Sequence, residues 1–196
     1  GNTADDFSDY VFAIVGDSLS SPINSGWTLW GAPVNPTVDT MEVNLSDDFT
    51  GYWTTYDYVD NGYTYDGFLQ QGEGYWLGAF ENATIDVLGS PSTSDMEIPL
   101  SLGWDLLSNP LILDVSTDSL IIINTNTQDT LLFPDAVNAG LVNSIYMYDG
   151  NGYSEPSILK PWHGYWFSVL SDNLIAKFPI HRHDQVVVAR DIREDS

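Results

Sequence analysis

The chain has 196 residues and a formal net charge of −23 at pH 7, because 28 Asp and Glu residues outnumber 5 Lys and Arg residues. Such a negative surface repels phosphate backbones and anionic lipids, so we expect neither nucleic acid nor a membrane surface as a partner. The chain has no cysteine, which excludes disulfides and thiolate metal sites, and no apolar run near the roughly 18 residues of a membrane span, so we expect no membrane insertion.

The apolar segments are short and rich in β-branched and aromatic residues, which favours strands over helices. In chain order they are YVFAIV (10–15), MEVNL (41–45), YWTTYDYV (52–59), GYWLGAF (74–80), ATIDVL (83–88), MEIPLSL (96–102), LIIINTNT (120–127), SIYMY (144–148), GYWFSVL (164–170), LIAKF (174–178) and QVVVA (185–189). Turn signals separate many of them at intervals typical of sandwiches and barrels. We therefore expect an all-β fold, a sandwich or a barrel-like domain of antiparallel strands with little helix.

The turns between several of these strands are also readable from the sequence. The segments DNGY (60–63) and DGNGY (149–153) contain Asn-Gly and Asp-Gly pairs. These pairs reach the positive φ angles that tight hairpin turns require. The sequence therefore predicts a β-hairpin at each of the two segments.

Much of the chain repeats once. Two segments recur 90 residues later: LQQGEGYWLGAF (69–80) as LKPWHGYWFSVL, and YDYVDNGY (56–63) as YMYDGNGY. A third segment, SGWTLWGAP (25–33), recurs 77 residues later as LGWDLLSNP. The difference between these two offsets indicates an insertion in the second copy. Within that insertion, Pro134 predicts the start of a short helix. We expect two related β-units with the same strand order around one core, and not a solenoid, which needs about three repeats.

The repeat defines the expected organisation of the chain. A first β-repeat covers 22–95 and a second covers 96–180. Residues 1–21 form an N-terminal strand or linker, and residues 181–196 form a C-terminal strand or tail.

The order Gly-Trp-x-Leu-x-x-x-Pro, then a Tyr-x-Tyr-Asp-Gly hairpin, then Leu-x-Pro-x-x-Gly-Tyr-Trp resembles a known bacterial repeat. That repeat occurs in large secreted and cell-surface proteins, especially of Bacteroidetes-like lineages, and in some surface-layer proteins. The resemblance covers most of residues 22–180, although the first copy has Gln71 where the proline is expected. It implies a β-rich accessory unit beside adhesion or polysaccharide-processing modules, located outside the cell or on its surface. It carries over no catalytic residue.

Aromatic residues fall into two groups when the copies are aligned. Six pairs recur: Trp27/Trp104, Tyr56/Tyr146, Tyr58/Tyr148, Tyr63/Tyr153, Tyr75/Tyr165 and Trp76/Trp166. We interpret these as residues that build the core and the hairpins, because a repeated fold requires them in both copies. Of the aromatic residues found in one copy only, Trp30, Trp53, Tyr65 and Trp162 are the predicted ligand-binding residues. The alternative is that they are scattered on the surface or pack between the halves.

The acidic turns raise the question of a metal. Oxygen ligands for Ca²⁺ are offered by Asp57, Asp60 and Asn61 around one turn and by Asp149 and Asn151 around its counterpart. The spacing is not that of an EF-hand, and the two turns do not share one ligand set. Turn formation alone, or adaptation of the whole surface to salt, are the alternatives. Calcium is therefore the one cofactor under consideration.

The sequence predicts no enzyme. It has no G-x-S-x-G nucleophile elbow and no glycine-rich phosphate loop. With 28 acidic residues, any two carboxylates could be proposed as the catalytic pair of a glycosidase, so the sequence indicates none of them. We expect a non-catalytic extracellular or cell-surface module that binds carbohydrate or takes part in adhesion, with a polysaccharide or another surface component as its partner. The alternative is a structural subunit of a surface layer or filament, which self-associates by adding YVFAIV or QVVVA to a neighbouring sheet.

Overall fold

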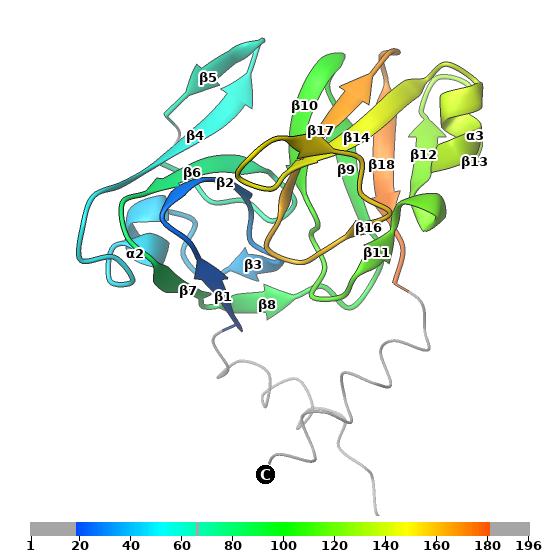
Figure 1. Ribbon diagram of the computed structural model, residues 1–196. Helices are drawn as coiled ribbons and strands as arrows, with labels where there is room; N and C mark the ends of the chain where they lie inside the picture. The colour runs from blue at the N-terminus through cyan, green and yellow to red at the C-terminus, as the bar shows by residue number, and fades with distance from the viewer. Residues whose placement is uncertain (1–18, 66, 181–196) are drawn as a thin grey trace, which may run out of the picture.

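The computed structural model describes residues 19–65 and 67–180, which form several antiparallel sheets with short helices (Figure 1). This confirms the predicted all-β, sandwich-like fold. Within the described ranges, no helix has the length and apolar character needed to cross a membrane. The segments YVFAIV and QVVVA lie outside the described residues.

The first half of the chain forms one four-stranded sheet and two smaller ones. Its elements are β1 (Leu19–Ile23), β2 (Gly26–Trp30), β3 (Val34–Pro36), helix α2 (Met41–Leu45), β4 (Trp53–Val59), β5 (Gly62–Thr64), β6 (Tyr75–Ala79), β7 (Ala83–Val87) and β8 (Gly89–Pro91). The sheet orders are β2-β6-β4-β5, β1-β7 and β3-β8. Because β1 pairs with β7 along its whole length, this first unit includes the chain from residue 19.

The second half repeats this plan with additions. Its elements are β9 (Met96–Leu100), β10 (Gly103–Ser108), β11 (Val115–Ser116), the 3-10 helix η1 (Thr117–Ser119), β12 (Ile121–Asn124), β13 (Thr130–Leu132), α3 (Phe133–Asn138), β14 (Val142–Tyr148), β15 (Tyr153–Ser154), β16 (Ile158–Leu159), β17 (Gly164–Val169) and β18 (Leu174–Phe178). The order β10-β17-β14-β15 matches β2-β6-β4-β5 strand for strand. The predicted equivalence in strand order is therefore confirmed.

The insertion in the second half is the β12–β13 hairpin and helix α3. The hairpin extends the β18-β9 pair, the counterpart of β1-β7, to the four-stranded order β13-β12-β18-β9. Helix α3 has Pro134 in its first turn, as predicted, where the missing N–H costs no hydrogen bond.

The strand predicted for MEVNL is wrong, because these residues form helix α2. Met41, Asn44 and Leu45 are all buried, and their spacing of three and four residues places them on one helical face. The Asn44 amide also donates hydrogen bonds to the carbonyl oxygens of Val38 and Thr40, at 2.6 and 2.8 Å, which fixes the start of the helix.

The predicted single core is also wrong, because each half has a buried cluster of its own. Trp30 and Leu77 belong to the first-half cluster, and Leu107 and Phe167 to the second. A third, small cluster joins the halves through Leu29, Leu106 and Trp166. The equivalent sheets β2-β6-β4-β5 and β10-β17-β14-β15 therefore each bury one face within their own half and present the other face to the neighbouring half and to solvent.

The halves meet in a reciprocal way. Trp30 forms a bridge to His163, and its counterpart Leu107 forms a bridge to Glu73, the counterpart of His163. Residue pairs exchanged in this manner are the signature of a two-fold interface. The chain therefore contains an approximate internal two-fold axis between β2 and β10.

Candidate functional site

In the equivalent sheets β2-β6-β4-β5 and β10-β17-β14-β15, the face turned away from the core carries aromatic side chains. In β6, Tyr75 and Leu77 belong to the first-half core, so Trp76 between them faces the opposite side. In β4, Tyr56 and Tyr58 are two residues apart, so their side chains lie on the same face of the strand. These outward rings meet those of the other half and form two pockets.

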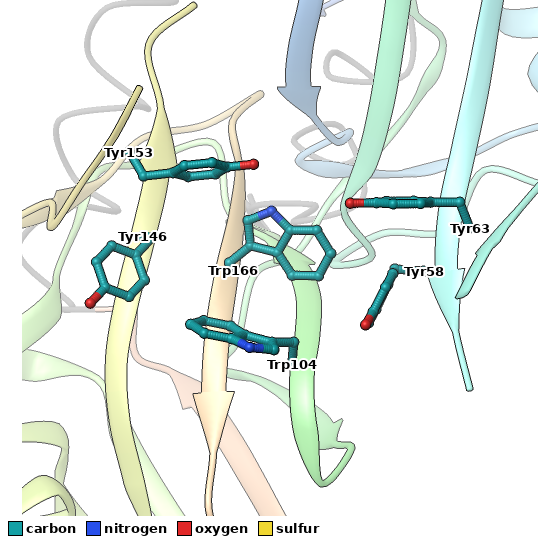
Figure 2. Close-up of a pocket in the computed structure, with 6 residues that line it drawn as sticks. All are labelled: Tyr58, Tyr63, Trp104, Tyr146, Tyr153 and Trp166. Carbon is teal, nitrogen blue, oxygen red and sulfur yellow. The ribbon is translucent and has the colours of Figure 1, made fainter. Parts of the chain in front are cut away.

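The first of these, pocket A, has a volume of about 440 Å³ (Figure 2). Its lining consists of Tyr58, Tyr63, Trp104, Tyr146, Tyr153 and Trp166. Tyr58 and Tyr63 come from the first half, and the other four come from the second half. Neither half alone supplies the whole pocket.

Trp166 is the centre of pocket A. Its ring is nearly perpendicular to those of Tyr58 and Trp104, at centroid distances of 4.8 and 6.4 Å. Such edge-to-face contacts place the positive edge of one ring against the negative face of another, which holds each ring in place. Trp104, which is 45% exposed, also packs against Tyr146 at 5.9 Å and leaves much of its surface open to a ligand.

Two tyrosine hydroxyls lie over this centre. In Figure 2 the phenol oxygens of Tyr63 and Tyr153 point toward each other from opposite sides of Trp166. Burial raises the pKa of Tyr153, and the neighbouring Tyr63 raises it further, while a hydrogen bond with Trp166 acts in the opposite direction. The Tyr153 phenol therefore stays neutral at pH 7, as a hydroxyl that both donates and accepts hydrogen bonds.

A second cavity, pocket B, has a volume of about 460 Å³. Its lining consists of Trp27, Tyr56, Tyr63, Trp76, Tyr148 and Tyr153. Tyr63 and Tyr153 line both pockets. The described lining of either pocket contains no charged side chain.

The two pockets together use five of the six aromatic pairs that recur in the sequence. The exception is Tyr75/Tyr165, whose rings are buried in the two cores. The prediction that the recurring aromatic residues serve packing is therefore right for this pair. It is wrong for Trp27 and Trp104, which are 49% and 45% exposed and line the pockets.

The predicted ligand-binding residues do not form a common site. Trp30 is fully buried, with its ring stacked against Trp162 at 6.2 Å, so its prediction as a contact residue is wrong. Trp53, at the start of β4, and Trp162, in the turn before β17, are half-buried and pack against the first-half core. Tyr65 is exposed but lines neither aromatic pocket. Packing between the halves, one of the alternatives considered, describes Trp30 and Trp162, whereas Trp53 packs within the first half, against Phe49.

Four of the five predicted calcium ligands lie at the hairpin turns, whereas Asp57 lies within β4, opposite Thr64 of β5. Asp60 and Asn61 have φ angles of 53° and 62°, which make them the two central residues of the β4–β5 turn. Asp149 accepts hydrogen bonds from the backbone N–H groups of Asn151 and Gly152, and these bonds lower its pKa. Across residues 19–65 and 67–180, no group of three or more His, Asp or Glu side chains is placed to hold a metal ion. Turn formation accounts for Asp149 without a metal.

Sequence reasoning missed the pockets because it treated recurrence as a sign of packing. A usable signal was present in the strands. Tyr56 and Tyr58 alternate with Thr55 and Asp57, so one face of β4 is aromatic while the other carries polar residues. Trp76 likewise lies between two core residues and has to face the opposite way.

Comparisons of the chain with protein-family models, with curated proteins and with solved structures found no match. The resemblance to the bacterial surface repeat therefore stays a prediction.

Proposed function

We propose that pocket A binds an uncharged carbohydrate, and that the chain is a non-catalytic binding module of an extracellular or cell-surface protein. The observation that carries this proposal is the lining of pocket A, in which all six side chains are Tyr or Trp. The negative faces of such rings attract the weakly positive C–H groups of a sugar ring. The phenol hydroxyls at the rim are suited to exchange hydrogen bonds with sugar hydroxyls.

Size and charge support a neutral sugar over other ligands. A volume of about 440 Å³ lies within the roughly 300–1,000 Å³ typical of small-molecule sites. The pocket offers no cationic group to an anion, and the net charge of −23 repels one. The apolar ring faces and the neutral hydroxyls instead match a ligand with apolar faces and many hydroxyl groups.

Affinity electrophoresis tests the proposal. The protein is run through gels that contain hydroxyethylcellulose, xylan, β-glucan or galactomannan. We expect at least one of these neutral polysaccharides to retard the parent. Trp104→Ala removes the most exposed tryptophan of pocket A, so we expect it to weaken binding at pocket A by tenfold or more, as truncation of an aromatic anchor commonly does.

Tyr65→Ala is the matched control. It removes an aromatic ring that is 61% exposed and lies outside both pockets, so binding should remain at the parental level. Failure of every polysaccharide to retard the parent would contradict the proposal. So would tight binding of tetramethylammonium or of a polyproline peptide, which are the other ligands that an aromatic pocket suits.

A further inference from the structure

We infer that pocket B is a second binding site for the same ligand, so that one chain binds two ligand units in opposite orientations. This inference rests on the proposed carbohydrate binding at pocket A. It extends that proposal to the number of ligands and to their arrangement.

Identity of the lining residues is the first argument. Each residue of pocket A has a partner of the same type in pocket B at the repeat position: Trp104/Trp27, Tyr146/Tyr56, Trp166/Trp76, Tyr58/Tyr148, Tyr63/Tyr153 and Tyr153/Tyr63. A ligand that is recognised by the chemistry of one lining therefore meets the same chemistry in the other.

Matching ring geometry is the second argument. The pair Trp104–Trp166 has a centroid distance of 6.4 Å and an interplanar angle of 86°, against 6.2 Å and 87° for Trp27–Trp76. The contact of Tyr58 with Trp166, at 4.8 Å, has its counterpart in that of Tyr148 with Trp76, at 5.1 Å. The two pockets are therefore alike in shape as well as in composition.

The orientation of the ligands follows from the internal two-fold axis. Rotation by 180° about an axis between the pockets exchanges them and reverses every direction that is perpendicular to this axis. A sugar chain has a reducing and a non-reducing end, so two units that are bound in the same way and run across the axis point in opposite directions. One continuous chain cannot fill both pockets identically, which favours two separate units, such as two neighbouring chains of a polysaccharide.

The pockets are not identical in every contact. Trp166 is almost fully buried, whereas Trp76 is half-buried. Gly78 lies opposite Trp27 in the β2–β6 strand pair, whereas Ser168 lies opposite Trp104 in the β10–β17 pair. The two sites should therefore bind the same ligand with different affinities.

Isothermal titration calorimetry with cellotriose, xylotriose and mannotriose measures the number of ligands that one chain binds. We expect a stoichiometry of two for the parent with at least one of these sugars. Trp27→Ala and Trp104→Ala should each reduce it to one, and the double variant should not bind. Both tryptophans are about half exposed, so truncation leaves the cores intact.

The indole N–H signals in a ¹⁵N-correlation spectrum provide a second readout that does not depend on fitting a stoichiometry. In Trp104→Ala, the sugar should still shift the signals of Trp27 and Trp76 and leave those of Trp30 and Trp53 in place. In Trp27→Ala, it should shift Trp104 and Trp166 instead.

The possible outcomes separate the two proposals. A stoichiometry of one that Trp104→Ala abolishes and Trp27→Ala leaves intact would overturn the second site but not the proposed function. A stoichiometry of one that either substitution abolishes would mean one ligand across both pockets, which also overturns the inference. No binding of any trisaccharide to the parent would overturn the second site, and failure of every polysaccharide to retard the parent as well would overturn both proposals.

Discussion

Each residue of the repeated Gly-Tyr-Trp tripeptide has a different task. In the first copy, Gly74 lies against the backbone of Leu107 in the other half, where a Cβ would come within 2.6 Å of the Leu107 carbonyl oxygen. Tyr75 is buried in its own core, and Trp76 faces the opposite way and lines pocket B. One tripeptide thus joins the halves, fills a core and supplies a pocket.

The buried tyrosines should contribute to stability through their hydroxyl groups. The N–H groups of Gln70 and Lys160, at matching repeat positions, donate hydrogen bonds to the phenol oxygens of Tyr75 and Tyr165, at 3.0 and 2.6 Å. Burial raises the pKa of Tyr165 to about 12, so its hydroxyl stays neutral at physiological pH. Tyr75→Phe or Tyr165→Phe leaves an amide without its partner, and each should lower the free energy of unfolding by about 1–3 kcal/mol.

Urea denaturation monitored by tryptophan fluorescence measures this loss. Tyr52→Phe is the control, because it removes the hydroxyl of a side chain that is 67% exposed, and it should leave the midpoint unchanged. Equal midpoints for the buried and the exposed variants would show that these hydroxyls contribute nothing to stability.

At the scale of the elements, much of the strand pattern could be predicted from composition and turn signals alone. A tight β4–β5 turn forms at DNGY as predicted, although its positive φ angles fall at Asp60 and Asn61 and not at Gly62, and helix α3 begins with Pro134 in its first turn. MEVNL was misjudged because five residues are too few to separate a helical period from a strand. The decisive interaction there is the side chain of Asn44, which binds backbone carbonyls and whose contacts depend on the tertiary fold.

The candidate site was harder to predict, for a related reason. Recurrence shows that a position matters to both copies, but it does not separate packing within one half from a surface built by both halves. Tyr58 faces pocket A and Tyr56 faces pocket B, although they lie two residues apart on one strand. Only the placement of one sheet against the other assigns each ring to its pocket.

The contact between the halves depends on a glycine, which gives a test at this scale. Gly74→Ala places a Cβ at 2.6 Å from the backbone oxygen of Leu107, which has no freedom to move away as a side chain would. Overpacking of this kind commonly costs about 1–3 kcal/mol. We expect a lower melting temperature and, because both pockets need both halves, weaker retardation by the polysaccharide.

Gly152→Ala is the matched control for this substitution. A Cβ at Gly152 would meet no atom within 4 Å, so the variant should melt with the parent. A Gly74→Ala protein as stable as the parent would mean that β10 shifts without cost, and the close approach would then not constrain the arrangement of the halves.

At the scale of the whole molecule, negative charge is almost uncompensated. Every Lys and Arg in the sequence lies at or beyond Lys160, so residues 1–159 contain only acidic charges. Among the described residues, Lys177 of β18 lies 3.1 Å from Asp95, just before β9, and 3.6 Å from Glu97 in the edge strand β9. Such exposed pairs are worth little. Mutual repulsion of the remaining carboxylates therefore opposes the compact state.

Salt should consequently stabilise the protein. Raising NaCl from 0.01 to 1 M shortens the screening length from about 30 to about 3 Å, which removes most of the repulsion between exposed carboxylates. For a chain of this size, each 1 kcal/mol of relief raises the melting temperature by about 2–4 °C. Differential scanning calorimetry across this range should show a steady increase, and a melting temperature indifferent to NaCl would rule out repulsion as a significant cost.

The same measurement separates screening from calcium binding. CaCl₂ and MgCl₂ at equal ionic strength screen alike, so screening alone predicts equal melting temperatures in the two salts. A calcium site at Asp57, Asp60 and Asn61 predicts a higher value in CaCl₂, because a bound ion stabilises the folded state in proportion to RT ln(1 + [L]/Kd). Asp57→Asn should then abolish the excess, whereas Asp118→Asn, far along the chain in η1, should retain it. Equal melting temperatures for the parent in the two salts would show that the acidic turns bind no calcium specifically. Screening would then explain the whole increase in melting temperature.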